Sequence, residues 1–164
     1  MKPSAAKNPP PIALRPAAPP DETFLIRLYA TTRATELTRT GWNAAQQDEF
    51  IRSQYHLRRA DYAARHPGFE HTILILDGQD IGAWMVARGH DHLLLINIEL
   101  LPAHRSRGIG SALIRRLFAE AKIARIPVRL SVREDNLAAT RLYRRLGFAL
   151  AARANGYLRL EHKP

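Results

Sequence analysis

A strand, a glycine-bearing turn and an amphipathic helix follow one another between residues 93 and 124, and this segment constrains the fold most. Apolar residues dominate 93–101, and Pro102 ends the predicted strand because proline cannot donate to a ladder. From 108 to 124 apolar residues recur at helical spacing. Another strand is predicted at 128–132. Strand, helix and strand then form one crossover unit, so this part of the sheet is predicted to be parallel.

The rest of the chain predicts helices and hairpins around this unit. Asp21 is a predicted helix N-cap, and Asn43 with Gln46 predicts a capping box at the start of a second helix. A tight-turn signal at 77–80 joins two strands into a meander, and Gly147 is predicted to end the last helix in the left-handed conformation. Strands are predicted at 12–15, 72–76, 81–87, 93–101, 128–132, 148–153 and 157–161, and the last two helices at 108–124 and 136–146. The predicted fold class is α/β (α+β): a single domain with a mixed, mostly antiparallel sheet of about seven strands flanked by about four helices.

Length and composition predict one compact domain and exclude several chemistries. The 164 residues divide into a Pro/Ala-rich tail at 1–10, predicted to be flexible, and a domain at 11–164. Cysteine is absent, which excludes disulfides, thiolate metal sites and a cysteine nucleophile. The histidines lack ligand spacing, so no metal is predicted. No apolar run reaches the roughly 20 residues that a bilayer requires. The sequence predicts a cytoplasmic location and no association with a membrane.

The net charge of +10 favours contact with anions such as nucleic acid, an acidic membrane surface or a phosphorylated cofactor. A solubilising surface is the alternative explanation. The chain contains no recognition motif for nucleic acid, and its aromatic residues do not interleave with basic ones. A nucleic-acid partner is therefore not predicted.

The turn at 105–111 has the properties of a phosphate-binding site. Gly108 and Gly110 let the backbone approach a ligand closely. The first amides of the following helix have no internal partner and lie at the positive end of its dipole. Arg105 and Arg107 add charge-assisted donors. Turn glycines without a ligand are the alternative. The segment lacks the ending of a P-loop and the three glycines of a dinucleotide fingerprint.

Two blocks in this half of the chain resemble the GCN5-related N-acetyltransferase (GNAT) family. Residues 105–110 match its Arg/Gln-x-x-Gly-x-Gly/Ala signature. Residues 136–148, Asn-Leu-Ala-Ala-Thr-Arg-Leu-Tyr-Arg-Arg-Leu-Gly-Phe, are similar to its Asn-x-x-Ala-x-x-Leu-Tyr-x-x-Leu-Gly-Phe block. The resemblance is sharp from about 93 to 148, and the predicted order of elements around it also fits.

The resemblance implies acetyl-CoA as co-substrate. The pantetheine arm would pair with the end of the preceding strand around Ile98, Leu100 and Leu101, where the family usually has a bulge and where the Leu100 amide could polarise the thioester carbonyl. Asn136 would touch the cofactor, or would serve only as a helix N-cap. The pyrophosphate would lie on Arg105, Ser106, Arg107, Gly108, Ile109, Gly110 and Ser111.

The resemblance also implies two catalytic roles. Tyr143 matches the tyrosine that lies near the sulfur, touches the cofactor and protonates the departing thiolate; a core aromatic is the alternative. The base is less defined, because apolar residues and Ser131 stand where family members often carry a carboxylate or histidine. Glu99 is the nearest acidic candidate, with a salt-bridged or solvated role as its alternative. The predicted catalytic pair is therefore Tyr143 and Glu99.

The predicted function is acetyl transfer to a primary amine of an unidentified small molecule or protein. A catalytically silent sensor of CoA or acyl-CoA is the alternative. The first two helices and the final hairpin are expected to select the acceptor, and the protein is expected to be a monomer or homodimer. The second-helix region offers Trp42, Tyr55, His56 and Tyr62, which could line the acceptor cleft or belong to the core.

Overall fold

The computed structural model describes residues 11–164, so the tail predicted at 1–10 lies outside the described part. Seven strands and four α-helices occur within it, as predicted. Two short 3₁₀ turns, η1 and η2, complete the set. In chain order the elements are β1 (Ala13–Pro16), η1 (Pro19–Asp21), α1 (Glu22–Leu37), α2 (Ala44–Arg65), β2 (Glu70–Leu76), β3 (Gln79–Arg88), β4 (Leu93–Leu100), η2 (Pro102–His104), α3 (Ile109–Ala124), β5 (Val128–Arg133), α4 (Leu137–Arg145), β6 (Ala149–Ala154) and β7 (Tyr157–His162).

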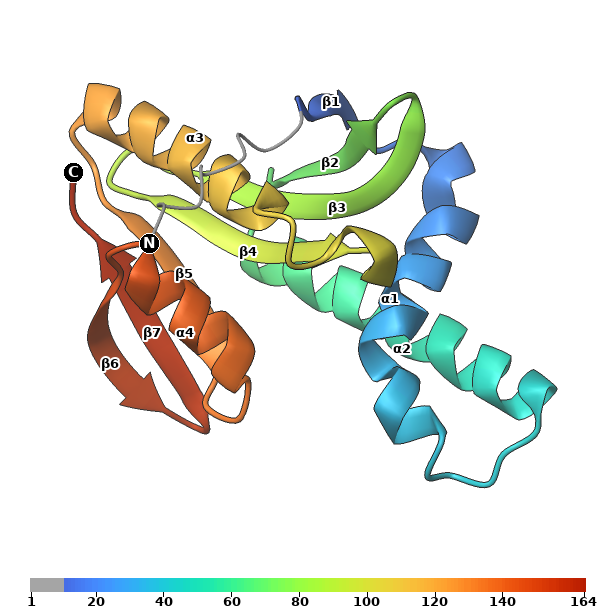
Figure 1. Cartoon of the computed structure of the whole chain (residues 1–164). Coiled ribbons are helices and arrows are strands. Elements are labelled where there is room, and N and C mark those ends of the chain that lie inside the picture. Colours follow the sequence, from blue (N-terminus) through green and yellow to red (C-terminus); the bar gives the residue numbers. More distant parts are fainter. Residues whose placement is uncertain (1–10) are drawn as a thin grey trace, which may run out of the picture.

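One mixed sheet runs through the molecule in the order β1-β2-β3-β4-β5-β7-β6. Only β4 and β5 are parallel, and every other neighbouring pair is antiparallel. This confirms the mixed, mostly antiparallel sheet and the single crossover through α3. Figure 1 shows α3 crossing over the sheet between these two strands.

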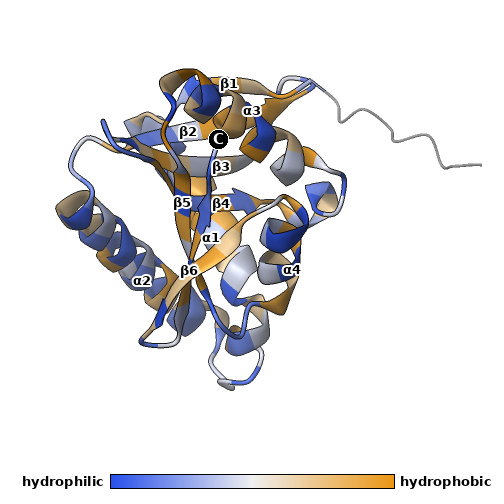
Figure 2. Ribbon diagram, turned by 90° about the vertical axis from the view of Figure 1, so that its left-hand side faces the viewer, coloured by the Kyte–Doolittle hydropathy of each residue, from blue (hydrophilic) through white to orange (hydrophobic). Residues whose placement is uncertain are grey.

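Helices cover both faces of the sheet and create two hydrophobic cores. One core joins α3 and α4 to β3, β4, β5 and β7, with Leu113 and Ile114 fully buried. The other joins α1 and α2 to β2 and β3, with Leu28 and Tyr55 at its centre. Figure 2 shows α2 on one side of the sheet and α3 and α4 on the other. A groove on one face can thus be built independently of a site on the other.

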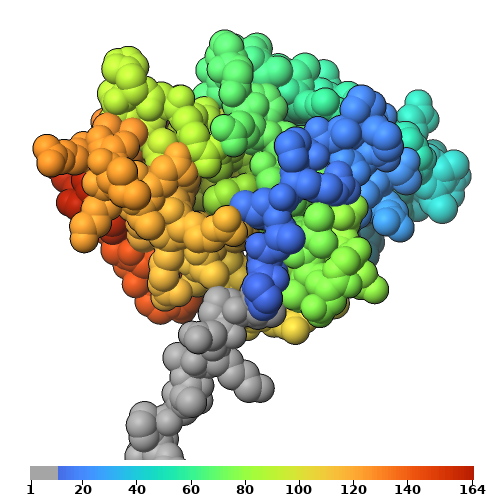
Figure 3. All heavy atoms as spheres, turned by 90° about the horizontal axis from the view of Figure 1, so that it is seen from above, coloured from blue at the N-terminus to red at the C-terminus, as the bar shows by residue number. Residues whose placement is uncertain are grey.

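The first described residues close one edge of this arrangement. β1 pairs antiparallel with β2, and the carbonyl of Ile12 accepts a hydrogen bond of 3.5 Å from Arg116 of α3. Figure 3 shows this segment, in blue, between α3 and the β2–β3 hairpin. Within residues 11–164 no helix is both long enough and apolar enough to cross a bilayer.

Local capping signals explain where the helices begin and end. The Asn43–Gln46 capping box is present, with both reciprocal hydrogen bonds at 3.0 Å. Gly147 has φ +96°, and the Phe148 amide bonds to the Tyr143 carbonyl at 3.0 Å, which confirms the predicted left-handed end. Asp21 occupies the N-cap position of α1 but does not cap it, because its carboxylate binds Arg15 at 2.7 Å instead.

Candidate active site

β4 and β5 form a ladder over only part of their length. Leu93, Leu94 and Leu95 pair with residues 128–130, and beyond Leu95 the two strands no longer pair. Figure 1 shows them diverging toward the side of the molecule where α1 lies. The opened end exposes main-chain groups of β4 that have no neighbouring strand. This opening meets the requirement for an extended ligand that pairs like a strand.

A bulge at Ile96 determines which side chains of β4 face each layer. Leu95 pairs with Val86 and Asn97 with Met85, so Ile96 has no partner on β3. We expected the bulge within 98–101, and the structure places it earlier. The extra residue reverses the alternation of the strand. Ile98 and Leu100 therefore pack toward α3, as Leu93 and Leu95 do.

The same alternation directs particular amides into the opening. Leu101 donates from its amide to Ile81 at 2.9 Å, so its main chain is engaged by β3. Successive residues of an antiparallel ladder point their amides to opposite sides. The amides of Leu100 and Ile98 thus point toward β5, into the opening. Gly82 lets β3 approach here, because a Cβ on Gly82 would lie 2.3 Å from the carbonyl oxygen of Glu99.

The turn between η2 and α3 presents bare amides beside this opening. Ser106 and Gly108 both have positive φ, +57° and +79°, which curls the chain before α3 begins at Ile109. Among the described residues, no backbone amide from Ser106 to Ser111 donates a hydrogen bond to the main chain. The side chains of residues 105–107 are exposed and leave the turn open. The helix dipole makes such a curl a site for anions.

The two arginines of the turn differ in what they contact. Arg105 folds back on the protein: its Nε donates to the Leu100 carbonyl and its Nη2 to the Thr31 hydroxyl, both at 2.8 Å. It thereby ties the turn to the end of β4 and to α1. Within residues 11–164 the only hydrogen-bond contact of the Arg107 side chain is with His104, at 3.4 Å, and Arg107 is exposed. Arg107 is therefore the freer of the two for a phosphate.

α4 places two more of the predicted residues. Asn136 caps the helix, with its Oδ1 accepting from the Ala139 amide at 3.1 Å, so its N-cap role is present. Tyr143 is 9% exposed and packs edge-on against Phe148 in the α3–α4 core. Burial alone raises the pKa of Tyr143 above its ordinary value. Its hydroxyl is consequently protonated at neutral pH, as a proton donor must be.

Glu99 projects from the other face of β4, toward α2. Its Oε1 accepts from Arg58 Nη1 at 2.6 Å and its Oε2 from Nη2 at 3.3 Å. The Arg58 guanidinium lies 4.1 Å from the centre of the Tyr29 ring. Burial opposes the charge of Arg58, but the charge and hydrogen bonds of Glu99 raise its pKa overall. The salt-bridged role of Glu99 is thus present.

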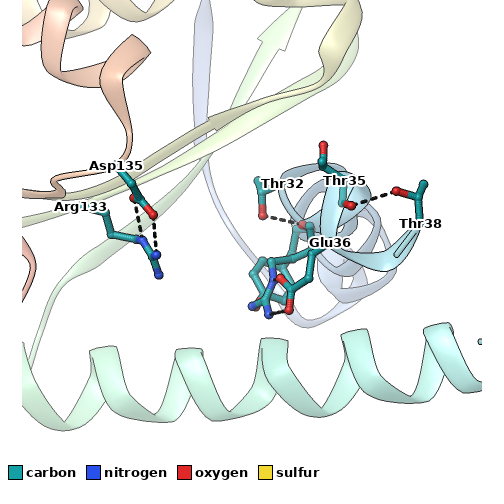
Figure 4. Close-up of polar contacts among 8 residues, drawn as sticks. Thr32, Thr35, Glu36, Thr38, Arg133 and Asp135 are labelled. Carbon is teal, nitrogen blue, oxygen red and sulfur yellow. Dashed lines mark hydrogen bonds and ion pairs between the residues drawn. The ribbon is translucent and has the colours of Figure 1, made fainter. Parts of the chain in front are cut away.

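α1 and the end of β5 carry two further ion pairs beside this one. Arg33 forms a double hydrogen bond with Glu36, at 2.6 and 2.8 Å. Arg133 does the same with Asp135, at 3.0 and 2.6 Å. Figure 4 shows the Arg133–Asp135 pair at the left and Glu36 to the right, with α2 running below both. Arg33, Arg58 and Arg133, each paired with a carboxylate, form a cluster, called here the α2 cluster, on the side of β4 that carries Glu99.

The residues considered for acceptor contact divide between the surface and the core. Tyr55 is 1% exposed and belongs to the core, whereas Trp42 is 39% exposed and His56 is exposed. Tyr62 is half-buried, 5.8 Å from the Arg58 guanidinium, and burial raises its pKa. Leu57, an apolar residue of α2, is 61% exposed and not part of either core.

Sequence reasoning missed Arg58 and His71. Arg58 lies seven residues after Ile51 and three after Tyr55, which puts an arginine on the buried stripe of α2; that spacing could have revealed it. His71 lies on β2 facing α2; burial lowers its pKa to about 4, and its Nε2 has no partner among the described residues. His71 is accordingly neutral and a weak base at physiological pH.

Comparison with known proteins agrees with this geometry. The model of the Acetyltransferase (GNAT) family matches residues 31–148. The chain therefore belongs to this family. The match includes the turn, the opened strand and α4. No curated protein sequence matches the chain significantly.

Solved structures share the whole fold at low sequence identity. The PaiA N-acetyltransferase of Thermoplasma acidophilum, in complex with coenzyme A, is 19% identical, with a TM-score of 0.67 over 94% of this chain and 99% of that one. A GNAT-family acetyltransferase from Listeria monocytogenes is 16% identical, with a TM-score of 0.62 over 93% and 95%. One from Elizabethkingia anophelis with acetyl-CoA bound is 14% identical, with a TM-score of 0.59 over 93% and 98%.

Proposed function

We propose that the protein transfers the acetyl group of acetyl-CoA to a primary amine. The observation that carries this proposal is the open curl from Ser106 to Ser111, whose bare amides adjoin the diverging end of β4. Such a curl would hold the diphosphate, and the free edge of β4 would hold the pantetheine arm. Two of the similar structures contain coenzyme A or acetyl-CoA, which supports this co-substrate.

The residues on either side of the opening have complementary roles in the proposed reaction. The amine nitrogen attacks the thioester carbonyl carbon, and the Leu100 amide stabilises the oxyanion that forms. Glu99 accepts the proton that the nitrogen loses. When the C–S bond breaks, Tyr143 donates its proton to the sulfur and recovers one from solvent. The carbonyl carbon would lie between the two layers, with acid on the α4 side and base on the α2 side.

Calorimetry with acetyl-CoA and a thiol-release assay over a panel of amines test this function. We expect one acetyl-CoA bound per chain and free thiol released with at least one amine, accompanied by the N-acetyl product in mass spectrometry. Absence of binding would contradict the site itself. Binding with no thiol release on any amine would instead support the silent sensor, which the engagement of Glu99 by Arg58 favours.

A further inference from the structure

The Arg58–Glu99 pair is the most buried ion pair among the described residues. The side chains are 20% and 9% exposed, whereas the other pairs keep at least one partner 37% exposed or more. Removing two charges from water is costly, and apolar residues in such a place often stabilise a protein as well or better. Stability alone therefore gives a weak reason for an arginine on the buried stripe of α2.

Arg58 also has unused hydrogen-bonding capacity. A guanidinium carries five N–H donors. In residues 11–164, Arg58 donates only to Glu99, through Nη1 and Nη2. Within residues 11–164 no Arg58 nitrogen is both buried and without a partner. The Nε, which donates to none of these residues, is therefore accessible to water, and an acceptor group from a ligand can reach it.

The surroundings of Arg58 restrict what that ligand can be. The rings of Tyr29 and Tyr62 lie 4.1 and 5.8 Å from its guanidinium and form apolar walls. The neighbouring Arg33 and Arg133 are already paired with carboxylates. Glu99 directly precedes Leu100, whose amide points into the opening between β4 and β5. A ligand bound beside the Arg58–Glu99 pair would therefore have its reactive end near the place where the proposed reaction occurs.

We propose that the acceptor is a zwitterion, an amine with a carboxylate on the neighbouring carbon, as in an α-amino acid. This inference rests on the proposed function. The carboxylate binds the spare donors of Arg58, and the ammonium lies beside Glu99, so that the charges of the ligand oppose those of the pair. A polyamine would bring positive charges against Arg33, Arg58 and Arg133. A peptide N-terminus would offer an amide where the carboxylate is required.

Three matched sets of acceptors test this substrate class: the twenty protein amino acids, their carboxamides, and the amines that lack the carboxylate. We expect kcat/KM to be higher for the best amino acids than for their partners by roughly 10- to 100-fold, the value of a charge-assisted hydrogen bond. Equal or higher values for carboxamides or simple amines would overturn this inference and leave the acetyltransferase function intact.

Two variants test whether the preference for amino acids depends on the guanidinium of Arg58. They are Arg58→Met and, as the neighbouring control, Arg59→Met. Arg59 is half-exposed and lies 4.0 Å from Glu22 on the surface. Arg58→Met should remove the preference for amino acids over simple amines, Arg58→Lys should retain part of it, and Arg59→Met should leave it unchanged. The ratio is measured within one variant, so a smaller folded fraction does not affect it. An unchanged ratio in Arg58→Met would contradict the assignment.

A binding measurement keeps this inference separate from the proposed function. Calorimetric titration of the three acceptor sets into the protein saturated with CoA does not require turnover. Amino acids that bind more tightly than their carboxamides would support the zwitterion site even if no thiol were released. Equal binding of both sets, or tighter binding of carboxamides, would overturn it. If Arg58→Met does not fold, the comparison of the three acceptor sets with the wild-type protein still tests the zwitterion site.

Discussion

The arginines on the two faces of the sheet differ in their ion pairing. On the α1–α2 face, Arg33 and Arg58 each form a double hydrogen bond with a carboxylate. On the α3–α4 face no arginine of either helix is in an ion pair with a described residue, and α4 contains no acidic residue. The exposed arginines of that face are Arg115, Arg116, Arg141, Arg144 and Arg145. The arginines of α3 and α4 thus carry charge without an ion-pair partner among the described residues, whereas those of the α2 cluster are paired; Arg27 of α1 is exposed and is the exception on the α1–α2 face.

This contrast suggests what each face is built to bind. A cofactor with several phosphates presents net negative charge, and free guanidinium groups suit it without any internal partner. A ligand of no net charge gains little from such a field and more from a fixed pair of opposite charges. The excess of +10 is therefore not one uniform property of the surface. The exposed arginines of α3 and α4 contribute to it, whereas Arg33 and Arg58 are balanced by their carboxylate partners and add nothing.

The largest effect is expected from a negative charge placed in the turn at 105–111. Gly108→Glu should weaken CoA binding by roughly 100-fold or more, because a like charge against an anion costs several kcal/mol. Calorimetry measures this effect. The matched control is Gly156→Glu, since Gly156 has a similar φ of +77° and open space around it but lies in the β6–β7 turn. Similar losses in both variants would mean that strain, not charge, is responsible.

Removing the phenol of Tyr143 should separate chemistry from binding on the cofactor face. Tyr143→Phe should lower kcat by about 100-fold, within the usual range for a general acid, with the affinity for acetyl-CoA unchanged. Because burial raises the pKa of Tyr143 above that of an ordinary tyrosine, the wild-type rate should hold through the pH at which an exposed tyrosine ionises and fall only at higher pH, where the donor is lost. Tyr55→Phe, in the other core, should change neither quantity. A wild-type rate in Tyr143→Phe across pH would refute the acid role.

A smaller loss is expected on the α2 face. Glu99→Gln should lower kcat/KM by roughly 10-fold at neutral pH, less than for the acid, because part of the amine is already unprotonated. The deficit should shrink as pH rises and more acceptor becomes neutral. Steady-state rates between pH 7 and pH 9.5 provide the measurement. Glu161→Gln, which loses the Arg129 pair at the sheet surface, is the control. A deficit that does not depend on pH would point to a structural role.

The smallest effect is expected from salt concentration, which should act differently on the two faces of the sheet. Mobile ions screen exposed charges more than buried pairs. Raising the salt concentration should therefore increase the KM for acetyl-CoA a few-fold and change the KM for the acceptor little. Both constants come from the same thiol-release assay, with potassium glutamate as a second salt to exclude a chloride effect. Equal sensitivity of the two constants would remove the electrostatic distinction between the faces.

Most of the fold could be predicted from the sequence because the capping and turn signals are local. The capping box at Asn43, the left-handed Gly147 and the turn at 105–111 each depend on residues close together in the chain. Their hydrogen bonds form within one turn of backbone, so the residue types alone indicate them. Of the predicted cofactor residues, the amides of Ile98 and Leu100 point into the opening and the turn presents bare amides, whereas Leu101 is engaged by β3 and the side chain of Arg105 by Leu100 and Thr31.

The α2 cluster could not be predicted in the same way. Arg58 and Glu99 are 41 residues apart, and only the tertiary packing of α2 on β4 brings them together. Asp21 illustrates the same limit, since Arg15 takes the carboxylate that would otherwise cap α1. The position of the bulge also depends on the pairing of β4 with β3, not on the composition of β4.

That single unpaired residue in β4 makes the length of the strand as important as its composition. Plain alternation from Leu93 onward would carry position 99 to the face that packs on α3. The extra residue at Ile96 reverses that order, so Glu99 faces the arginine of α2 while Ile98 and Leu100 stay in the hydrophobic layer beneath α3. Deleting one residue there would remove the bulge and leave these faces unchanged, so such a variant would separate the bend of the strand from the side on which its residues lie.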